Sequence, residues 1–186
     1  MANFIETSLP GVIIIEPKVF KDARGLFFEM YRENEYQEAG ITGSFVQENH
    51  SHSTKGVLRG LHYQLKHPQG KLFTVLRGEL FDVVVDIRVG SPTFGRSMTV
   101  LLSADNHRQL YIPPGYAHGC CAISDVVDLV YKATDYYQPT DEYGIAWNDP
   151  ILAIDWPVAS PLLSPKDASY VYLQDQAAAL LPRYTG

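Results

Sequence analysis

Hydrophobic and polar positions alternate along much of this chain, in short runs separated by glycine and proline. Alternation with a period of two, rich in β-branched and aromatic residues, is typical of β-strands with one buried face. Helical periodicity is confined to 34–39 and to a C-terminal piece at 168–180. Many short strands with little helix predict an all-β sandwich or jelly-roll barrel with minor helical segments. The predicted strands are 12–15, 26–31, two strands within 71–88, 97–103, 109–112 and 126–134.

The segment 71–88 is expected to form a β-hairpin around Gly78 and Glu79, although Gly-Glu is only a fair two-residue turn. In such a hairpin Lys71 lies across from Asp86, and Asp82 lies further along the same face. The opposite face carries apolar side chains. Two interpretations of the three charges stay open: a solvated outer face, or a polar pocket inside a barrel.

Strand periodicity also sorts other polar residues by face. In 126–134, Tyr131 shares its face with apolar residues, so it is expected to point into the barrel. Arg59 and His62 are separated by an odd number of residues, and a regular strand would send them to opposite faces. If both serve one site, the chain must bulge or bend near Gly60, which glycine permits.

Composition narrows the class of protein. A chain of 186 residues is most simply one domain, 1–186, and 46% hydrophobic with 19% charged residues is ordinary for a soluble globular protein. The net charge of −6 argues against a nucleic-acid partner, which normally needs a basic face. No apolar run suits a signal sequence or a membrane span, so no membrane partner is expected. Cys120 and Cys121 are adjacent, a spacing that strains a disulfide, which favours a reducing, cytoplasmic location.

The segment 47–64 concentrates groups that bind anions and move protons. It holds the amides of Gln47 and Asn49 together with Arg59 and His62, around a strand-like run. A base, an acid, a cation and several anion donors together indicate an enzyme for a phosphorylated or nucleotide-linked substrate. Further candidates follow on separate strands and turns: Lys71, His118, Tyr131 and Asp167.

An ordered set of motifs runs from about residue 4 to residue 176: RGLHYQ, QGK, FDVVVDIR, SPTFG, PPGYAHG, YKATDYY, WND and SPKDA. Each is weak alone, but in this order they resemble the dTDP-4-dehydrorhamnose 3,5-epimerase family. The resemblance implies a cupin-type jelly roll, a homodimer, no metal and no other cofactor. It also implies a dTDP-linked 4-keto sugar as substrate, dTDP-4-dehydro-6-deoxy-D-glucose. The implied product is dTDP-4-dehydro-L-rhamnose, at the third step toward dTDP-L-rhamnose.

The same resemblance implies residue roles. His62 is the base, since an imidazole titrates close to neutral pH, and Asp167 is the carboxylate that pairs with it. Tyr131 matches the acid that reprotonates the opposite face of the sugar. Lys71 matches the cation near the C4 oxygen, where enolate charge develops. The implied substrate-binding residues are Arg24, Glu29, Gln47, Glu48, Asn49, Arg59, Lys71, His118, Glu142 and Lys166.

In the implied homodimer, the N-terminal segment is expected to help complete a neighbouring subunit's sheet or site, because the run at 12–15 needs a sheet partner. Phe20, Phe27 and Tyr137 are available to stack on a base or to line the sugar pocket.

Three other functions stay open. An epimerase that inverts only C3 or only C5 of a related sugar is the nearest, although Tyr131 favours the double reaction. A metal-dependent cupin is disfavoured, because its first motif supplies His-x-His where this chain has His62-Tyr63-Gln64. A cupin that only binds sugar nucleotides is disfavoured as well, since binding needs no acid opposite a base.

Overall fold

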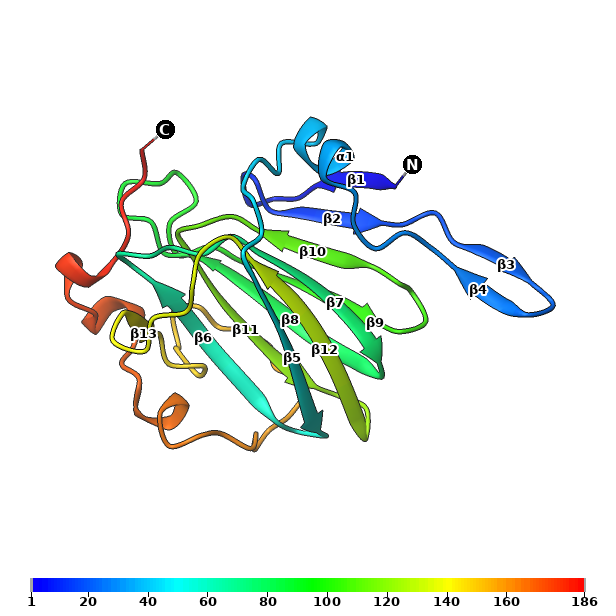
Figure 1. Ribbon diagram of the computed structural model, residues 1–186. Helices are drawn as coiled ribbons and strands as arrows, with labels where there is room; N and C mark the ends of the chain where they lie inside the picture. Colours follow the sequence, from blue (N-terminus) through cyan, green and yellow to red (C-terminus); the bar gives the residue numbers. More distant parts are fainter. Residues whose placement is uncertain (1, 186) are drawn as a thin grey trace.

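The computed structural model describes residues 2–185 as two antiparallel sheets that face each other, with an arm projecting from one end (Figure 1). The strands are β1 (Asn3–Glu6), β2 (Ile13–Glu16), β3 (Phe20–Asp22), β4 (Gly25–Phe27), β5 (Gln47–Thr54), β6 (Leu58–Gln64), β7 (Lys71–Arg77), β8 (Glu79–Asp86), β9 (Ser97–Ser103), β10 (Gln109–Ile112), β11 (Tyr116–Ala122), β12 (Val126–Ala133) and β13 (Glu142–Gly144). One sheet has the order β1-β2-β10-β7-β12-β5, and the other has the order β13-β6-β11-β8-β9. The predicted all-β jelly roll is confirmed.

Helical structure in the described residues is slight: α1 (Glu33–Glu38) and three single turns, η1 (Asp167–Ser169), η2 (Leu173–Asp175) and η3 (Ala178–Leu180). The helix at 34–39 is confirmed, and the helical piece predicted at 168–180 is present as these three separate turns. The chain becomes extended at Tyr170 and Gln176, so each turn ends separately. Within residues 2–185, no helix has the length and hydropathy needed to cross a membrane.

The hairpin predicted at 71–88 is wrong. β7 pairs with β10 and β12 in one sheet, whereas β8 pairs with β9 and β11 in the other. Gly78 joins them with a φ of +79°, and a Cβ there would lie 2.1 Å from the carbonyl oxygen of Val126. The chain therefore turns from one sheet to the other at a position that only glycine fits.

The separation of β7 and β8 at Gly78 decides between the two interpretations of the charges predicted on one face of 71–88. Lys71 lines a cavity between the sheets, and Asp82 is fully buried against His118. The polar-pocket interpretation therefore holds for these two residues. Asp86 is also buried, but it binds Arg88 and nearby hydroxyl groups instead of facing the cavity.

The strand predicted at 26–31 ends at Phe27, where β4 stops. Beyond it the chain leaves the arm and turns into α1. The carbonyl of Met30 accepts hydrogen bonds from the Tyr36 hydroxyl and the Gln109 amide, at 2.9 Å each. Side chains thus take the place of a strand partner for this segment.

Three hydrophobic cores hold the layers together. Val84 and Leu129 belong to the core between the sheets. Leu61 and Leu173 belong to a second core, on the outer face of the five-stranded sheet, which the C-terminal segment covers. Tyr36 of α1 belongs to the third, on the outer face of the six-stranded sheet. The second core fixes the C-terminal segment beside β6, where the candidate site lies.

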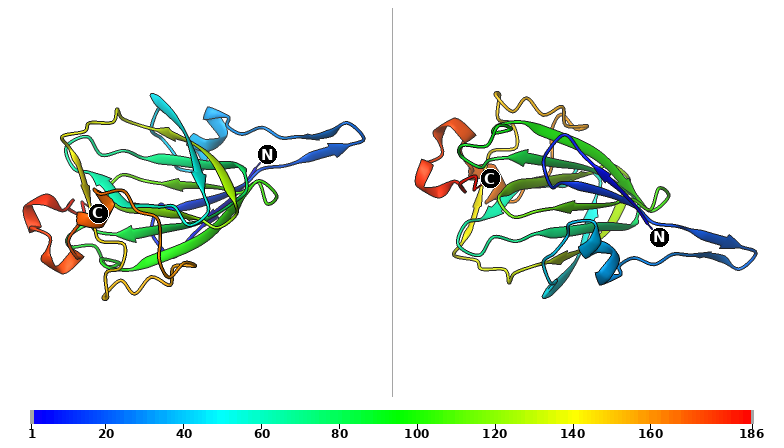
Figure 2. Two further views of the ribbon diagram at one scale, coloured as in Figure 1. Left: turned by 90° about the horizontal axis from the view of Figure 1, so that it is seen from below. Right: turned by 90° about the horizontal axis from the view of Figure 1, so that it is seen from above.

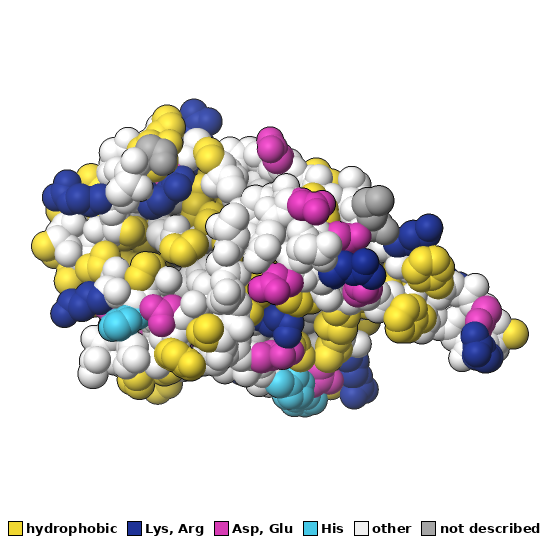
Figure 3. Space-filling view, turned by 45° about the horizontal axis from the view of Figure 1, so that its top comes forward, with side chains coloured by type: hydrophobic (Ala, Val, Ile, Leu, Met, Phe, Trp, Pro, Cys, Tyr) yellow, Lys and Arg dark blue, Asp and Glu magenta, His cyan; other side chains and the backbone are white. Residues whose placement is uncertain are grey.

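The arm formed by β3 and β4 stands clear of the barrel in both views of Figure 2. Its large apolar side chains are unusually exposed: Phe20 by 54%, Leu26 by 50% and Phe27 by 70%. Hydrophobic side chains along the projecting arm are visible in the space-filling view (Figure 3). A clustered apolar surface of this kind is typical of a segment that packs against another molecule.

Candidate active site

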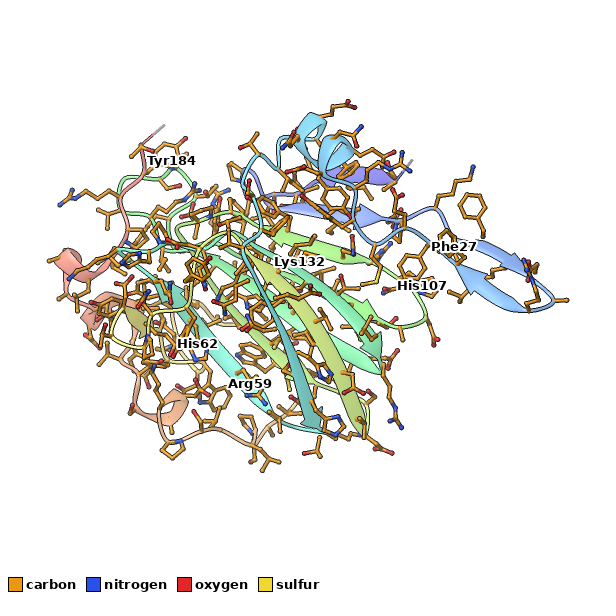
Figure 4. The ribbon with its side chains drawn as sticks, viewed as in Figure 1. Phe27, Arg59, His62, His107, Lys132 and Tyr184 are labelled. Atoms are coloured by element: carbon orange, nitrogen blue, oxygen red, sulfur yellow. The ribbon has the colours of Figure 1, made fainter. Side chains whose placement is uncertain are left out.

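A cavity of about 400 Å³ opens between the two sheets. Strands β5, β7 and β12 supply one wall, β6 and β11 supply the other, and the C-terminal segment closes one side. Figure 4 shows Arg59 and His62, both from β6, on the side of the barrel away from the arm. The lining residues are Gln47, Asn49, Ser51, Arg59, His62, Lys71, Phe73, His118, Cys120, Leu129, Tyr131, Tyr137, Glu142, Ser164, Lys166 and Asp167.

Arg59 and His62 reach the same cavity because β6 is irregular between them. Its register with β11 shifts at this point, and Gly60 has a φ of +122°. A Cβ on Gly60 would lie 2.4 Å from the Cα of Gly119, so the two backbones approach too closely for any side chain. The bend predicted near Gly60 is confirmed.

His62 and Asp167 form a tight pair. His62 Nε2 donates to Asp167 Oδ1 at 2.5 Å, and the Ser164 hydroxyl donates to Asp167 Oδ2 at 2.7 Å. Burial alone would raise the pKa of Asp167, but these hydrogen bonds outweigh burial and hold that pKa below its usual value. An ionised Asp167 accepts the hydrogen bond from Nε2 and so fixes the His62 tautomer.

The other nitrogen of His62 faces a different carboxylate. Nδ1 lies 3.9 Å from Glu142 Oε1, too far for a hydrogen bond. Glu142 is instead paired with Lys166 and accepts a hydrogen bond from the Tyr137 hydroxyl at 3.1 Å. Burial raises the pKa of Glu142, yet the Lys166 hydrogen bond brings it below its ordinary value. Nδ1 is therefore the nitrogen left for a ligand.

Tyr131 and Lys71 face this pair from the opposite sheet. Tyr131 points inward as strand parity predicted, with its ring 5.1 Å from that of Phe73. The Lys71 ammonium lies 6.0 Å from the centre of the Tyr131 ring. Burial raises the pKa of Tyr131 and lowers that of Lys71, although the Glu142 carboxylate partly opposes the change at Lys71. The cavity thus holds an imidazole and its carboxylate on one side and a phenol and an amine on the other.

His118 lies on β11, directly opposite His62 in the antiparallel register. Its Nε2 is 2.9 Å from each oxygen of Asp82, and its ring stacks on Phe73 at 4.1 Å. Among residues 2–185, no group of three His, Cys, Asp or Glu side chains is arranged to hold a metal ion.

Some residues that were predicted to bind the ligand do not line the cavity of their own chain. Arg24 lies on the arm, paired with Asp22, and Glu29 is paired with Arg32. Glu48 alternates with the inward-facing Gln47 and Asn49, so it points outward, where it pairs with Lys132. The remaining predicted residues meet in the cavity: Gln47, Asn49, Arg59, His62, Lys71, His118, Tyr131, Glu142, Lys166 and Asp167.

The site also contains residues that the sequence did not single out. Ser164 begins the SPKD motif, and its position three residues before Asp167 is the spacing of a local side-chain turn. Tyr170 lies edge-on to His62, with ring centres 5.7 Å apart. No sequence signal marks this second contact, because it joins the C-terminal segment to a strand about a hundred residues earlier.

A jelly roll that opens on a His–Asp pair, a phenol and a lysine is a cupin-type protein with the groups of proton-transfer chemistry. The family described as dTDP-4-dehydrorhamnose 3,5-epimerase matches residues 6–175. This chain belongs to that family, as its motifs predicted.

Close relatives cover nearly the whole chain. The dTDP-4-dehydrorhamnose 3,5-epimerase of Shigella flexneri is 55% identical over 167 residues, 89% of this chain and 92% of that protein. The enzyme of the same name from Neisseria gonorrhoeae is 52% identical over 180 residues; these are 96% of this chain but 55% of that longer relative. The crystal structure of dTDP-6-deoxy-D-glucose-3,5-epimerase from Legionella pneumophila, in complex with dTDP-4-keto-L-rhamnose, has a TM-score of 0.97 and 53% identity, covering 100% of both chains.

Proposed function

We propose that this protein converts dTDP-4-dehydro-6-deoxy-D-glucose to dTDP-4-dehydro-L-rhamnose by inverting C3 and C5. It is a dTDP-4-dehydrorhamnose 3,5-epimerase of dTDP-rhamnose biosynthesis. One observation carries the assignment. A chain more than 50% identical to epimerases of this name holds a His–Asp pair across one cavity from a tyrosine and a lysine.

The C4 ketone of the substrate makes the hydrogens on C3 and C5 acidic, because removing either one gives an enolate. His62 acts as the base through Nδ1, since Nε2 is held by Asp167. Asp167 stabilises the imidazolium that forms when the proton is taken. Lys71 stabilises the negative charge on the C4 oxygen.

Inversion also needs a proton delivered to the opposite face of the ring. Tyr131 supplies it from the facing sheet, and its buried position matters more than its acidity. Burial raises the pKa of the phenol, so the neutral form that can donate is the one present. An enzyme that only bound the sugar nucleotide would not need an acid opposite a base.

The nucleotide and its phosphates are held toward the mouth of the cavity. Arg59, whose Nε is 3.3 Å from the Ser53 hydroxyl, carries a planar guanidinium that can engage two phosphate oxygens. The amides of Gln47 and Asn49 and the ammonium of Lys166 complete this grip. Lys166 is about half exposed, so it can exchange Glu142 for a phosphate.

We further propose a homodimer in which the arm of one protomer reaches the cavity of its partner. This explains why Arg24 and Glu29 lie outside their own cavity, and why the arm exposes Phe20 and Phe27. Arg24→Ala should raise KM while the barrel stays folded. Sedimentation at micromolar concentration tests the assembly, and a monomeric active enzyme would contradict it.

We place the enzyme in the cytoplasm and treat the chain as one domain. Cys120 and Cys121 are both buried free thiols, the state expected in a reducing compartment. The core between the sheets draws its residues from Leu9 through Leu129, so the barrel strands share one interior.

Incubation of the enzyme with the 4-keto substrate in heavy water tests this function. Deuterium should appear at both C3 and C5 by NMR as the L-sugar forms. Exchange at only one carbon would identify a single-centre epimerase, and no exchange at either carbon would remove the epimerase assignment.

A further inference from the structure

A second His–Asp pair lies beside the first, in the same cavity. His62 on β6 and His118 on β11 are directly opposed in the antiparallel register, and both line the cavity. Each imidazole has its own buried carboxylate: Asp167 for His62, and Asp82 for His118. The first pair serves as the base in the proposed function, whereas the second has no role in it.

The stability of the fold does not explain Asp82. The residue is fully buried, and its two oxygens lie 2.9 Å from His118 Nε2, with no other hydrogen-bond donor among the described side chains. Taking a carboxylate out of water costs several kcal/mol, and an apolar residue of similar size is often as stable or more stable in such a place.

Asp86 on the same strand shows what a structural carboxylate looks like here. It is equally buried, but it accepts hydrogen bonds from Arg88, Ser91 and Thr93, which tie the strand to the following loop. Asp82 has one partner, and that partner faces the ligand cavity. Asp82 therefore contacts a residue of the cavity, whereas Asp86 holds a strand and a loop together.

The surroundings of His118 place it with the groups that handle the sugar. Its ring stacks on Phe73 at 4.1 Å, and Phe73 in turn lies 5.1 Å from the ring of Tyr131. His118, His62 and Lys71 also line a common small recess beside the main cavity. Lys71 comes from one sheet and the two histidines from the other, so their side chains converge from both walls.

We propose that Asp82 is a positioning residue that holds His118 by Nε2, so that His118 acts together with Lys71 on the C4 oxygen. This inference rests on the proposed epimerase function and assigns His118 to the sugar, not to the nucleotide grip. Asp82 binds Nε2, so Nδ1 is the nitrogen left for the sugar, and a proton carried there donates to the C4 oxygen. When His62 takes the proton from C3 or C5, the electron pair of that C–H bond moves to the C4 oxygen. Donors from opposite sheets then stabilise the enolate.

Binding of dTDP without a sugar distinguishes the two possible roles of His118, at the phosphates or at the C4 oxygen. dTDP carries the base and both phosphates but no sugar, so its dissociation constant reports the nucleotide grip. A His118 that holds phosphate affects dTDP binding, whereas one that acts at the C4 oxygen affects kcat and leaves dTDP affinity unchanged.

Asp82→Asn keeps the shape of the side chain but replaces the carboxyl group that holds His118 with an amide. We expect kcat to fall by about tenfold or more, with the Kd of dTDP from calorimetry unchanged. The matched control is Asp128→Asn, because Asp128 also pairs with a histidine, His52, but on the outer face of the barrel. It should leave both quantities as in the wild type. A wild-type kcat in Asp82→Asn, or a dTDP affinity that falls in parallel with kcat, would overturn the proposal.

Removing His118 alone would leave an unpaired buried carboxylate and endanger folding. The double variant Asp82→Asn/His118→Gln avoids this, and its near-UV circular dichroism should match that of the wild type. We expect kcat to fall by about 100-fold with dTDP binding retained. A folded double variant that no longer binds dTDP would show that His118 binds the phosphates. If the double variant does not fold, the result for Asp82→Asn tests the proposal. A wild type without deuterium exchange would overturn the epimerase assignment itself, which is a different outcome.

Discussion

The two nitrogens of His62 have different surroundings, and this difference fixes the direction of proton transfer. Nε2 is held by the buried Asp167, while Nδ1 is open to a ligand. In the proposed reaction Asp167 tunes the base, whereas His62 itself accepts the proton. We therefore expect the loss of His62 and the loss of Asp167 to affect the reaction unequally.

His62→Ala should reduce epimerisation to the limit of detection, and Asp167→Asn should lower kcat on the order of 10²-fold or more. We expect the larger loss of activity in His62→Ala, because a histidine base still works poorly without its carboxylate partner, whereas no proton is taken when the base itself is missing. Single-turnover kinetics with the 4-keto substrate measure both. Wild-type deuterium exchange at C3 in His62→Ala would show that another group is the base.

Tyr131→Phe should separate proton removal from inversion. The base, Lys71 and the nucleotide grip stay in place, so solvent deuterium should still enter C3 or C5. Inversion should fail, because no acid remains on the opposite face. Since the ring is packed against Phe73, the melting temperature and dTDP affinity should stay near wild type. A variant that forms the L-sugar at the normal rate would transfer the role of acid to water or to another phenol, such as Tyr137.

At the scale of single elements, β6 depends more on Gly60, inside the strand, than on Gly56, in the turn before it. Gly60 and Gly56 both have positive φ, but a Cβ would meet backbone atoms only at Gly60. Gly56→Ala should cost about 1 to 2 kcal/mol of unfolding free energy, the strain of a left-handed residue alone. Gly60→Ala should cost several times more and lower activity, because Arg59 and His62 would no longer share a cavity. Denaturant unfolding of both variants tests this, and equal losses would contradict it.

Local patterns predicted several elements well and failed where distant contacts decide. The strands at 97–103 and 109–112 match β9 and β10, and parity placed Tyr131 inward. Parity could not reveal that β7 and β8 separate at Gly78, because the choice depends on which strands offer partners elsewhere in the chain.

The candidate site shows the same division. Alternation on β5 explains why Gln47 and Asn49 line the cavity while Glu48 does not. The role of Asp82 could not be predicted, since a charge on an amphipathic strand is usually solvated and only the second sheet buries it. Tyr170 was missed because its contact with His62 is purely tertiary.

At the scale of the whole molecule, one network centred on the buried Asp86 joins several parts of the chain. The guanidinium of Arg88 donates two hydrogen bonds to Asp86, of 2.9 and 2.7 Å, and it lies over the rings of Tyr116 and Tyr184. The Tyr116 hydroxyl donates to the carbonyl of Pro10 at 2.7 Å. The network thus links β8, β11 and both ends of the chain.

This network predicts an acid limit to stability. Burial raises the pKa of Asp86, but hydrogen bonds from Arg88, Ser91 and Thr93 outweigh it and lower that pKa to about 2. A carboxyl group whose pKa is lower in the folded state than in the unfolded state stabilises the protein at pH values above the unfolded-state pKa. This contribution is lost as the pH falls through the folded-state pKa. The excess stability of wild type over Asp86→Asn should therefore shrink by about 2 kcal/mol between about pH 4 and pH 2. Unfolding free energies measured across this range test it, and a constant difference would contradict it.

The distance along the chain between His62 and Asp167 has a consequence for synthesis. The two residues are 105 positions apart. A ribosome adding about 5 to 20 residues per second completes Asp167 on the order of 5 to 20 s after His62. By then the last barrel strand, β13, has been made, with Arg59, Lys71 and Tyr131 already in the nascent chain. A translation product that stalls between residues 145 and 166 would carry all the strands but no partner for the base. If Asp167 is the partner that His62 needs, epimerisation during cell-free translation should begin only after Asp167 has been made, later than the strands that carry the other candidate residues.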